Sequence, residues 1–145
     1  MDLELPPDIR DALAHHAHDL WELLTVDAGC SVSIVGHDGR LLWANERTLI
    51  DYEWHLSIRY PQASGAELDP IGKLLKDILR PEFAIERVEF VHEAIASGKT
   101  IVYESILRGV RQRVSIRPIG KAAPKRAIFV ARRLRGVERI RDLIP

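Results

Sequence analysis

The chain has 145 residues, a length that accommodates one domain with short extensions. Its 46% hydrophobic residues are enough for a buried core, and its 21 Lys and Arg balance its 21 Asp and Glu. The neutral balance gives no electrostatic support for binding nucleic acid or a membrane surface. A single cysteine, Cys30, excludes an internal disulfide. No apolar run approaches the roughly 18 residues of a membrane span, and no secretion signal is evident, so we expect a cytoplasmic protein.

Residues 1–27 are predicted to form a leader and an amphipathic helix. Apolar positions recur three or four residues apart, which places them on one face of a helix. That stripe either packs on its own domain or pairs with the same stripe of a second copy, and we take it as the candidate dimer interface. Its residues are Ile9, Leu13, His16, Leu20 and Leu24. His15 and His18 stand three residues apart in the same segment, but no further ligand pattern accompanies them, and we predict no metal site.

A β-hairpin is predicted next. Two short apolar runs, Val32–Val35 and Leu41–Ala44, flank the sequence His-Asp-Gly-Arg. Asp-Gly between β-formers favours a tight hairpin turn, because glycine adopts positive φ without steric cost.

Helical patterns dominate the middle of the chain. We expect short helices over residues 46–54 and 71–79, separated by a loop over residues 55–70 that contains two prolines and a glycine. The clearest helix covers residues 81–97, since Pro81 suits a first helical position and Gly98 a C-terminal stop. Its predicted buried face consists of Ile85, Val88, Val91 or His92, and Ile95.

Three strand-like runs follow, over residues 101–107, 110–118 and 127–134, and residues 135–144 are expected to form a tail or a short exit helix. Strands at both ends with helices between them do not form a βαβ array. The pattern predicts an α+β fold in which helices cover one face of an antiparallel sheet.

Five segments resemble the PAS domain family in the family's order. They are VSIVGHDGRLLWAN, IGKLLKDIL, VHEAIASGKTIVYE, GVRQRVSIRPI and RAIFVARRL. The resemblance implies a core over residues 28–134, followed by a tail over residues 135–145. It also implies five antiparallel strands in the spatial order 2-1-5-4-3. One departure is a longer connection around residues 57–69, which we interpret as a tolerated surface insertion, the alternative being a modified lid over a ligand cavity.

The residues point to binding and not to catalysis. No nucleophile–base pair, P-loop or dinucleotide fingerprint is present, so we predict no enzymatic activity. Cys30 precedes the first strand, which does not match the flavin-binding relatives. His92 stands on the helix that carries the haem ligand in others, and haem is kept as an alternative. A small-molecule pocket between sheet and helices is the main expectation. Its candidate residues are Tyr52, Trp54, His55, Arg59, His92 and Tyr103.

The sequence therefore predicts a PAS-like sensory module without a resident cofactor. It would bind a small molecule or a signalling protein in trans and act as a homodimer. A ligand-free interaction or dimerisation module is the alternative. The pattern leaves open which ligand or partner binds, and whether the chain is a stand-alone protein or part of a longer one.

Overall fold

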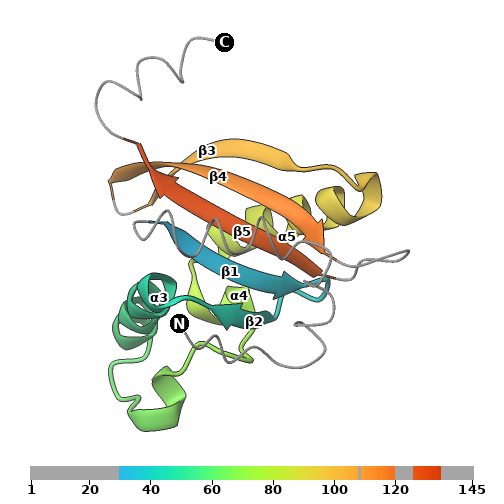
Figure 1. Cartoon of the computed structure of the whole chain (residues 1–145). Coiled ribbons are helices and arrows are strands. Elements are labelled where there is room, and N and C mark those ends of the chain that lie inside the picture. The colour runs from blue at the N-terminus through green and yellow to red at the C-terminus, as the bar shows by residue number, and fades with distance from the viewer. Residues whose placement is uncertain (1–29, 108, 120–125, 135–145) are drawn as a thin grey trace.

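The computed structural model describes residues 30–107, 109–119 and 126–134. Five strands and four helical segments make up this part of the chain (Figure 1). The strands are β1 (Ser31–Gly36), β2 (Leu41–Ala44), β3 (Ile101–Leu107), β4 (Val110–Ile119) and β5 (Arg126–Arg133). The helical segments are α3 (Glu46–Arg59), the 3-10 turn η2 (Gly65–Leu68), α4 (Leu75–Ile78) and α5 (Pro81–Ser97). The predicted N-terminal helix and exit helix lie outside the described residues.

The strands form one antiparallel sheet in the order β2-β1-β5-β4-β3, which confirms the predicted topology. The first and last strands of the sequence are central neighbours, with Ser31 opposite Ala131 and Gly36 opposite Arg126. Helix α5 packs against β4 and β5, and α3 packs against β1 and β2 (Figure 1). The architecture is therefore a curved sheet with these helices on one face. None of the helices described is long and apolar enough to cross a membrane.

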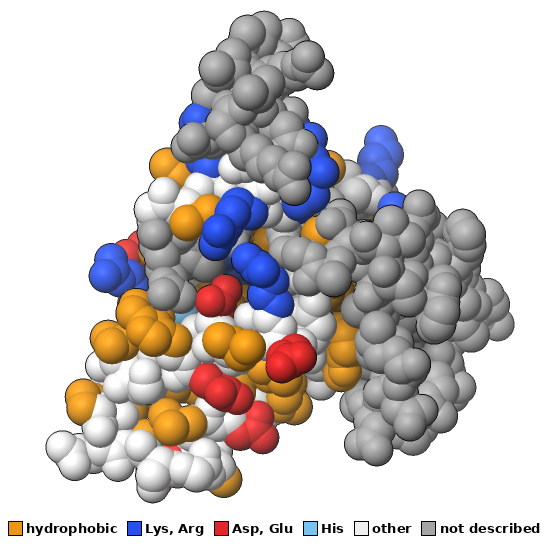
Figure 2. Space-filling view, turned by 60° about the vertical axis from the view of Figure 1, so that its left-hand side comes forward, with side chains coloured by type: hydrophobic (Ala, Val, Ile, Leu, Met, Phe, Trp, Pro, Cys, Tyr) orange, Lys and Arg blue, Asp and Glu red, His pale blue; other side chains and the backbone are white. Residues whose placement is uncertain are grey.

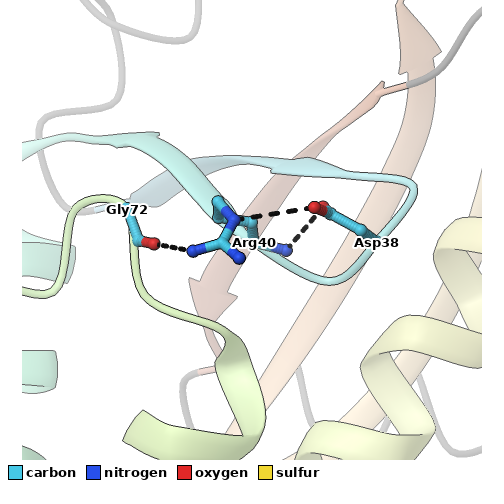
Figure 3. A network of polar contacts seen from close by, with 3 residues as sticks. All are labelled: Asp38, Arg40 and Gly72. Atoms are coloured by element: carbon cyan, nitrogen blue, oxygen red, sulfur yellow. Dashed lines mark hydrogen bonds and ion pairs between the residues drawn. The ribbon is translucent and has the colours of Figure 1, made fainter.

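The β1–β2 hairpin turns at Gly39, whose φ of +87° is accessible to glycine at little cost. The Arg40 side chain fixes this turn to the segment before α4. Its Nε lies 3.6 Å from the Asp38 carboxylate, and its Nη1 donates to the carbonyl oxygen of Gly72 (Figure 3). Main-chain hydrogen bonds from Leu41 to Lys73 and from Gly72 to Leu41 complete the attachment.

Asn45 joins the hairpin to α3. Its side-chain oxygen accepts from the Thr48 amide at 3.2 Å, as an N-cap does, and from the Val32 amide at 3.1 Å. Its Nδ2 donates to the Cys30 carbonyl oxygen at 2.9 Å. One amide side chain therefore fixes the start of α3 against β1.

Helix α3 is longer than the sequence predicts. It continues past Trp54 to Arg59, because Leu56 adds a fully buried apolar position one turn beyond Tyr52. Pro61 follows the C-cap residue Tyr60, consistent with the restriction that proline places on the preceding backbone. Conversely, α4 is only the four residues Leu75–Ile78, and the predicted helix over residues 71–79 is wrong at its N-terminal half.

Helix α5 has the predicted bounds, and among the predicted buried positions only Val91 is fully buried. Pro81 stands at its start, and Gly98 ends it with a φ of +68°. Ile85, predicted to be buried, is 58% exposed, and His92 is also exposed. Val88 and Ile95 are only partly buried. The fully buried positions are Ala84, Arg87, Val91 and Ala94.

Buried side chains lie on both faces of the sheet. The main cluster lies between sheet and helices and includes Val35, Leu56, Val91 and Ile116. By strand alternation the opposite face carries a second cluster, in which Cys30, Val32, Ile34, Ile119 and Ile128 are buried.

Candidate functional site

A small cavity lies between the sheet and the helices α3 and α5. Its volume is about 30 Å³, room for one or two water molecules. Its walls are unusually polar for the interior of a small domain. They consist of Ser31, Ser33, Thr48, Asp51, Tyr52, Arg87, Gln112, Val114, Phe129 and Ala131. We call this space the Arg87 cavity.

Strand register explains why these residues meet. Ser31 is opposite Ala131 on β5, and Ala131 is opposite Val114 on β4. Gln112, two residues before Val114, points to the same face of the sheet. The helices add Tyr52 from α3 and Arg87 from α5, so five elements converge on one end of the sheet.

Arg87 dominates the electrostatics of this site. Its side chain is 5% exposed, and its Nη1 atom is buried with no hydrogen-bond partner. The guanidinium interacts with the hydroxyl of Tyr52, a hydrogen bond that favours the phenolate and tends to lower the tyrosine's pKa. The described residues form no salt bridge to Arg87.

Two tyrosines face this charge and remain neutral. Burial raises the pKa of Tyr52, and the opposing effect of Arg87 is smaller. Burial likewise raises the pKa of Tyr103 to about 12, again against the attraction of Arg87. Tyr103 stacks on Phe90 of α5, with ring centroids 4.3 Å apart, and its buried hydroxyl has no hydrogen-bond partner. The cavity thus presents the Tyr52 hydroxyl beside a permanent cation, and Tyr103 interacts with the same charge from outside the cavity lining.

Only two of the six predicted ligand residues lie near Arg87. Tyr52 and Tyr103 lie close enough to Arg87, and to each other, for their charges to interact. Whether these residues bind a ligand stays a prediction.

Three other predicted residues, Trp54, His55 and Arg59, line a separate surface groove. This groove has a volume of about 570 Å³ and runs between α3, the start of α5 and the β3–β4 turn, with Ile58, Phe83 and Ile106 among its other walls. Arg59 also donates to the carbonyl oxygens of Lys76 at 2.6 Å and Leu79 at 2.8 Å, so it holds the end of α3 to α4. Hydrophobic side chains are visible on the face of the molecule that comes forward in Figure 2.

His92 lies at a third place, on the exposed side of α5. Its Nε2 is 2.7 Å from the carbonyl oxygen of His37, and the two imidazole rings stack with centroids 4.3 Å apart. The His92 side chain is therefore held against the hairpin turn. It is not part of the Arg87 cavity, and the placement gives the haem alternative no support.

Sequence reasoning missed Arg87, Gln112 and Ser105. Ser105 lies on β3 opposite Gln112, and its buried hydroxyl has no hydrogen-bond partner. A signal for Arg87 was present, since Ala84, Arg87, Val91 and Ala94 recur at helical spacings of three, four and three. Arginine is normally exposed, and the predicted buried face of this helix does not include Arg87.

The predicted insertion, metal sites and the predicted dimer stripe are considered next to the cavity. Residues 60–67 of the predicted insertion are mostly exposed, and none of residues 57–69 lines the Arg87 cavity. Within the described ranges no three His, Cys, Asp or Glu side chains gather as a metal site would require. The predicted dimer stripe and the histidines near it lie outside the described residues.

Comparison with known proteins identifies the fold. No protein-family model matches the sequence, and no curated protein is found to be similar to it. Solved structures do match. A domain of an HTR-like protein from Haloarcula marismortui is 18% identical with a TM-score of 0.55, over 74% of this chain and 99% of that one. A sensory box sensor histidine kinase from Vibrio cholerae is 17% identical with a TM-score of 0.54, over 87% and 98%.

The PAS domain of BvgS from Bordetella pertussis is also 17% identical, with a TM-score of 0.57 over 88% of this chain and 94% of that one. These likenesses agree with the strand order and the placement of the helices. The chain has a PAS domain fold.

Proposed function

We propose that this protein is a sensory PAS module that binds a small molecule in the Arg87 cavity and relays a conformational change, without enzymatic activity of its own. The observation that carries the proposal is a polar, incompletely filled space at the centre of an otherwise apolar layer. Ligand sites contain a few convergent polar groups, as this cavity does, although its volume of about 30 Å³ is far below the several hundred Å³ that is typical of such sites. The sensor histidine kinase from Vibrio cholerae among the proteins of similar fold supports a signalling role.

The position of the cavity suits signal relay. A bound molecule would contact Tyr52 on α3, Arg87 on α5 and the inner face of the sheet together. A ligand shifts an equilibrium between two conformations only by its difference in affinity for them. A contact shared by two helices and a sheet supplies such a difference when the helices move relative to the strands.

The output proposed is a change in association. The stripe of Ile9, Leu13, His16, Leu20 and Leu24 would pair two copies, or a signalling protein in trans would bind, in the cytoplasm. Residues entering β1 lead directly to Ser31, which lines the cavity. In this proposal a change in the cavity reaches that segment through the chain that enters β1.

Extraction of the purified protein tests the sensing role. The protein is denatured, the supernatant is analysed by mass spectrometry, and the native sample is scanned by absorbance. A stoichiometric small molecule supports sensing, and a Soret band that is lost in His92→Ala would instead support the haem alternative. Protein that releases nothing, and whose unfolding temperature is unchanged across a metabolite library, would contradict the proposal.

A second candidate function is a ligand-free interaction module. Ile50, Trp54 and Ile58 recur four residues apart on α3 and are 60%, 42% and 62% exposed, an apolar stripe next to the groove. Self-association through this stripe predicts that Ile58→Glu converts a dimer to a monomer in sedimentation experiments. Glu53→Lys, an exposed charge change on the same helix, is the control and leaves the dimer intact.

A further inference from the structure

The outer face of the sheet, which is turned away from the helices, carries a buried apolar cluster of strand residues and the adjoining Cys30. Val32 and Ile34 on β1 are 0% exposed, and Ile119 and Ile128 are also buried. No residue of α3, α4 or α5 belongs to this cluster, in contrast to the cluster on the helical face. A single layer of strands does not remove its own face from water, so this face requires a cover.

Five arginines accompany that cluster on the outer face. By strand alternation they are Arg111, Arg113 and Arg117 of β4 and Arg126 and Arg132 of β5. Arg113 lies directly opposite Arg132, and like charges in that position repel each other. Among the described residues of this face only Glu104, opposite Arg113 on β3, is acidic. The outer face therefore combines an apolar strip with a band of positive charge, which we call the arginine band.

The neutral total charge of the chain conceals an uneven division. Residues 1–29 contain seven Asp and Glu and one Arg, whereas residues 30–145 contain 14 Asp and Glu and 20 Lys and Arg. In the helix predicted for this acidic segment, Asp8, Asp11, Asp19 and Glu22 follow one another at intervals of three, eight and three residues, so they share one side of it. That acidic side runs beside the apolar stripe predicted for the same helix.

Chain connectivity brings the acidic segment to the arginine band. The segment is followed by Cys30, and β1 begins at Ser31, opposite Ala131, the residue before Arg132. The segment therefore joins the sheet beside the Arg113–Arg132 pair. Such a short tether gives its acidic and apolar side chains a high effective concentration at this face.

We propose that residues 1–29 of the same chain dock on the outer face of the sheet, with the apolar stripe over the buried cluster and the acidic side against the arginine band. Docking supplies the two things that this face requires, an apolar cover and negative charge. The proposal goes beyond the proposed function and needs no ligand in the Arg87 cavity. Docking also covers the stripe that would pair two copies. If the proposed function holds, release of the segment therefore makes the stripe available for association.

Hydrogen exchange of the full chain, measured by mass spectrometry on peptides from residues 8–24, tests the docking. Arg113→Glu combined with Arg132→Glu should speed exchange in these peptides at least fivefold, and Asp19→Lys combined with Glu22→Lys should do the same, because each leaves like charges facing each other. Arg47→Glu, a reversal at an exposed arginine of α3, is the matched control and should leave exchange unchanged.

The four-residue charge swap separates pairing from general damage. Combining both pairs of reversals should slow exchange at least threefold relative to either pair alone, because opposite charges meet again. Absence of this rescue would overturn the arginine band as the docking surface, as would unchanged exchange in both two-residue variants.

Two measurements on the wild type keep the test decisive if the arginine variants fail to fold. Raising the salt concentration from about 0.05 M to about 0.5 M should speed exchange in residues 8–24, because it screens charge pairs, and exchange without any protection at low salt would overturn docking. Rates should be equal at low and high protein concentration. Protection that appears only at high concentration would overturn docking within one chain and assign the surface to the acidic segment of a second copy. Failure of the extraction experiment would leave these results unchanged.

Discussion

The two ends of the layer between sheet and helices are equally buried but chemically different. At the hairpin end, Val35, Leu41 and Val91 are almost fully buried and carry no polar side-chain atoms. At the other end, Ser33, Thr48 and Arg87 are buried to nearly the same extent. The strand register separates the ends, since Val35 is opposite Ala127 whereas Ser31 is opposite Ala131.

This difference shows that burial alone does not distinguish a core from a site. The apolar end gains free energy from every side chain that it removes from water. At the polar end each group requires an acceptor or a donor, and Arg87, Tyr103 and Ser105 lack part of theirs. Fold stability is thus expected to depend mainly on the hairpin end, and binding on the other.

The largest effect is expected in the main apolar cluster. Ile116 is fully buried on β4, between β3 and β5. Ile116→Ala should lower the free energy of unfolding by about 3 kcal/mol, because it leaves a cavity that the neighbours fill only in part. Urea unfolding followed by circular dichroism measures the change. A loss below about 1 kcal/mol would mean that this cluster is not the rigid part of the layer.

Asn45 tests whether a polar group that has all its partners contributes to stability. Asn45→Ala removes the N-cap of α3 and the bonds to Val32 and Cys30, so a loss of about 2 kcal/mol is expected in the same assay. Asn45→Asp keeps the accepting oxygen and loses only the donor. Its free energy of unfolding should lie between those of the wild type and Asn45→Ala. An aspartate variant that is no more stable than the alanine variant would contradict the expectation that the accepting oxygen contributes to stability.

Removing Arg87, unlike removing Asn45, is not expected to lower the free energy of unfolding. In ligand-free protein Arg87→Met should be neutral or raise the free energy of unfolding by about 1 kcal/mol, because it replaces an unbalanced buried charge with apolar volume. The urea midpoint reports the change, and Arg47→Met gives the baseline for an exposed arginine. A loss comparable to that of Ile116→Ala would show that the guanidinium is part of the structural core, and the contrast between the ends would disappear.

The smallest effect concerns pH. The phenol of Tyr103 loses its proton near pH 10 in the unfolded chain and near pH 12 in the folded one, because burial opposes ionisation. The unfolded state therefore releases its proton first as pH rises, and stability from this group is present below pH 10 and lost between 10 and 12. Tyr103→Phe should show a shallower decline over that interval in thermal unfolding. Identical slopes would mean that the hydroxyl is in contact with water.

Sequence patterns predicted the sheet well because its signals are local. The Asp-Gly turn and the alternation of Val114 and Ile116 with Arg113, Ser115 and Arg117 fix register and facing without reference to distant residues. The resemblance to PAS domains supplied the strand order. Helix limits set by proline and glycine were also correct for α5, whereas α3 extended further because Leu56 packs on the core.

The candidate site was harder to predict because it depends on tertiary contacts. Hydrophobicity alone places Ile85 inside and Arg87 outside, and the structure has the reverse. The polar aromatic residues chosen from the sequence separate into three places, since Trp54 and Tyr52 point to different sides of the same helix. The rotation of α5 about its axis is set by packing on β4, which no local pattern encodes.

The pairing of Ser31 with Ala131 also gives the domain a mechanical property. The chain enters the sheet at β1 and leaves it from β5 at the same end, about 5 Å apart as neighbouring strands are. Any segment tethered there, upstream or downstream, is attached beside the Arg87 cavity and far from the hairpin. The same geometry makes the domain a candidate for circular permutation, with a short linker across this end and new termini opened in the exposed connection after α3.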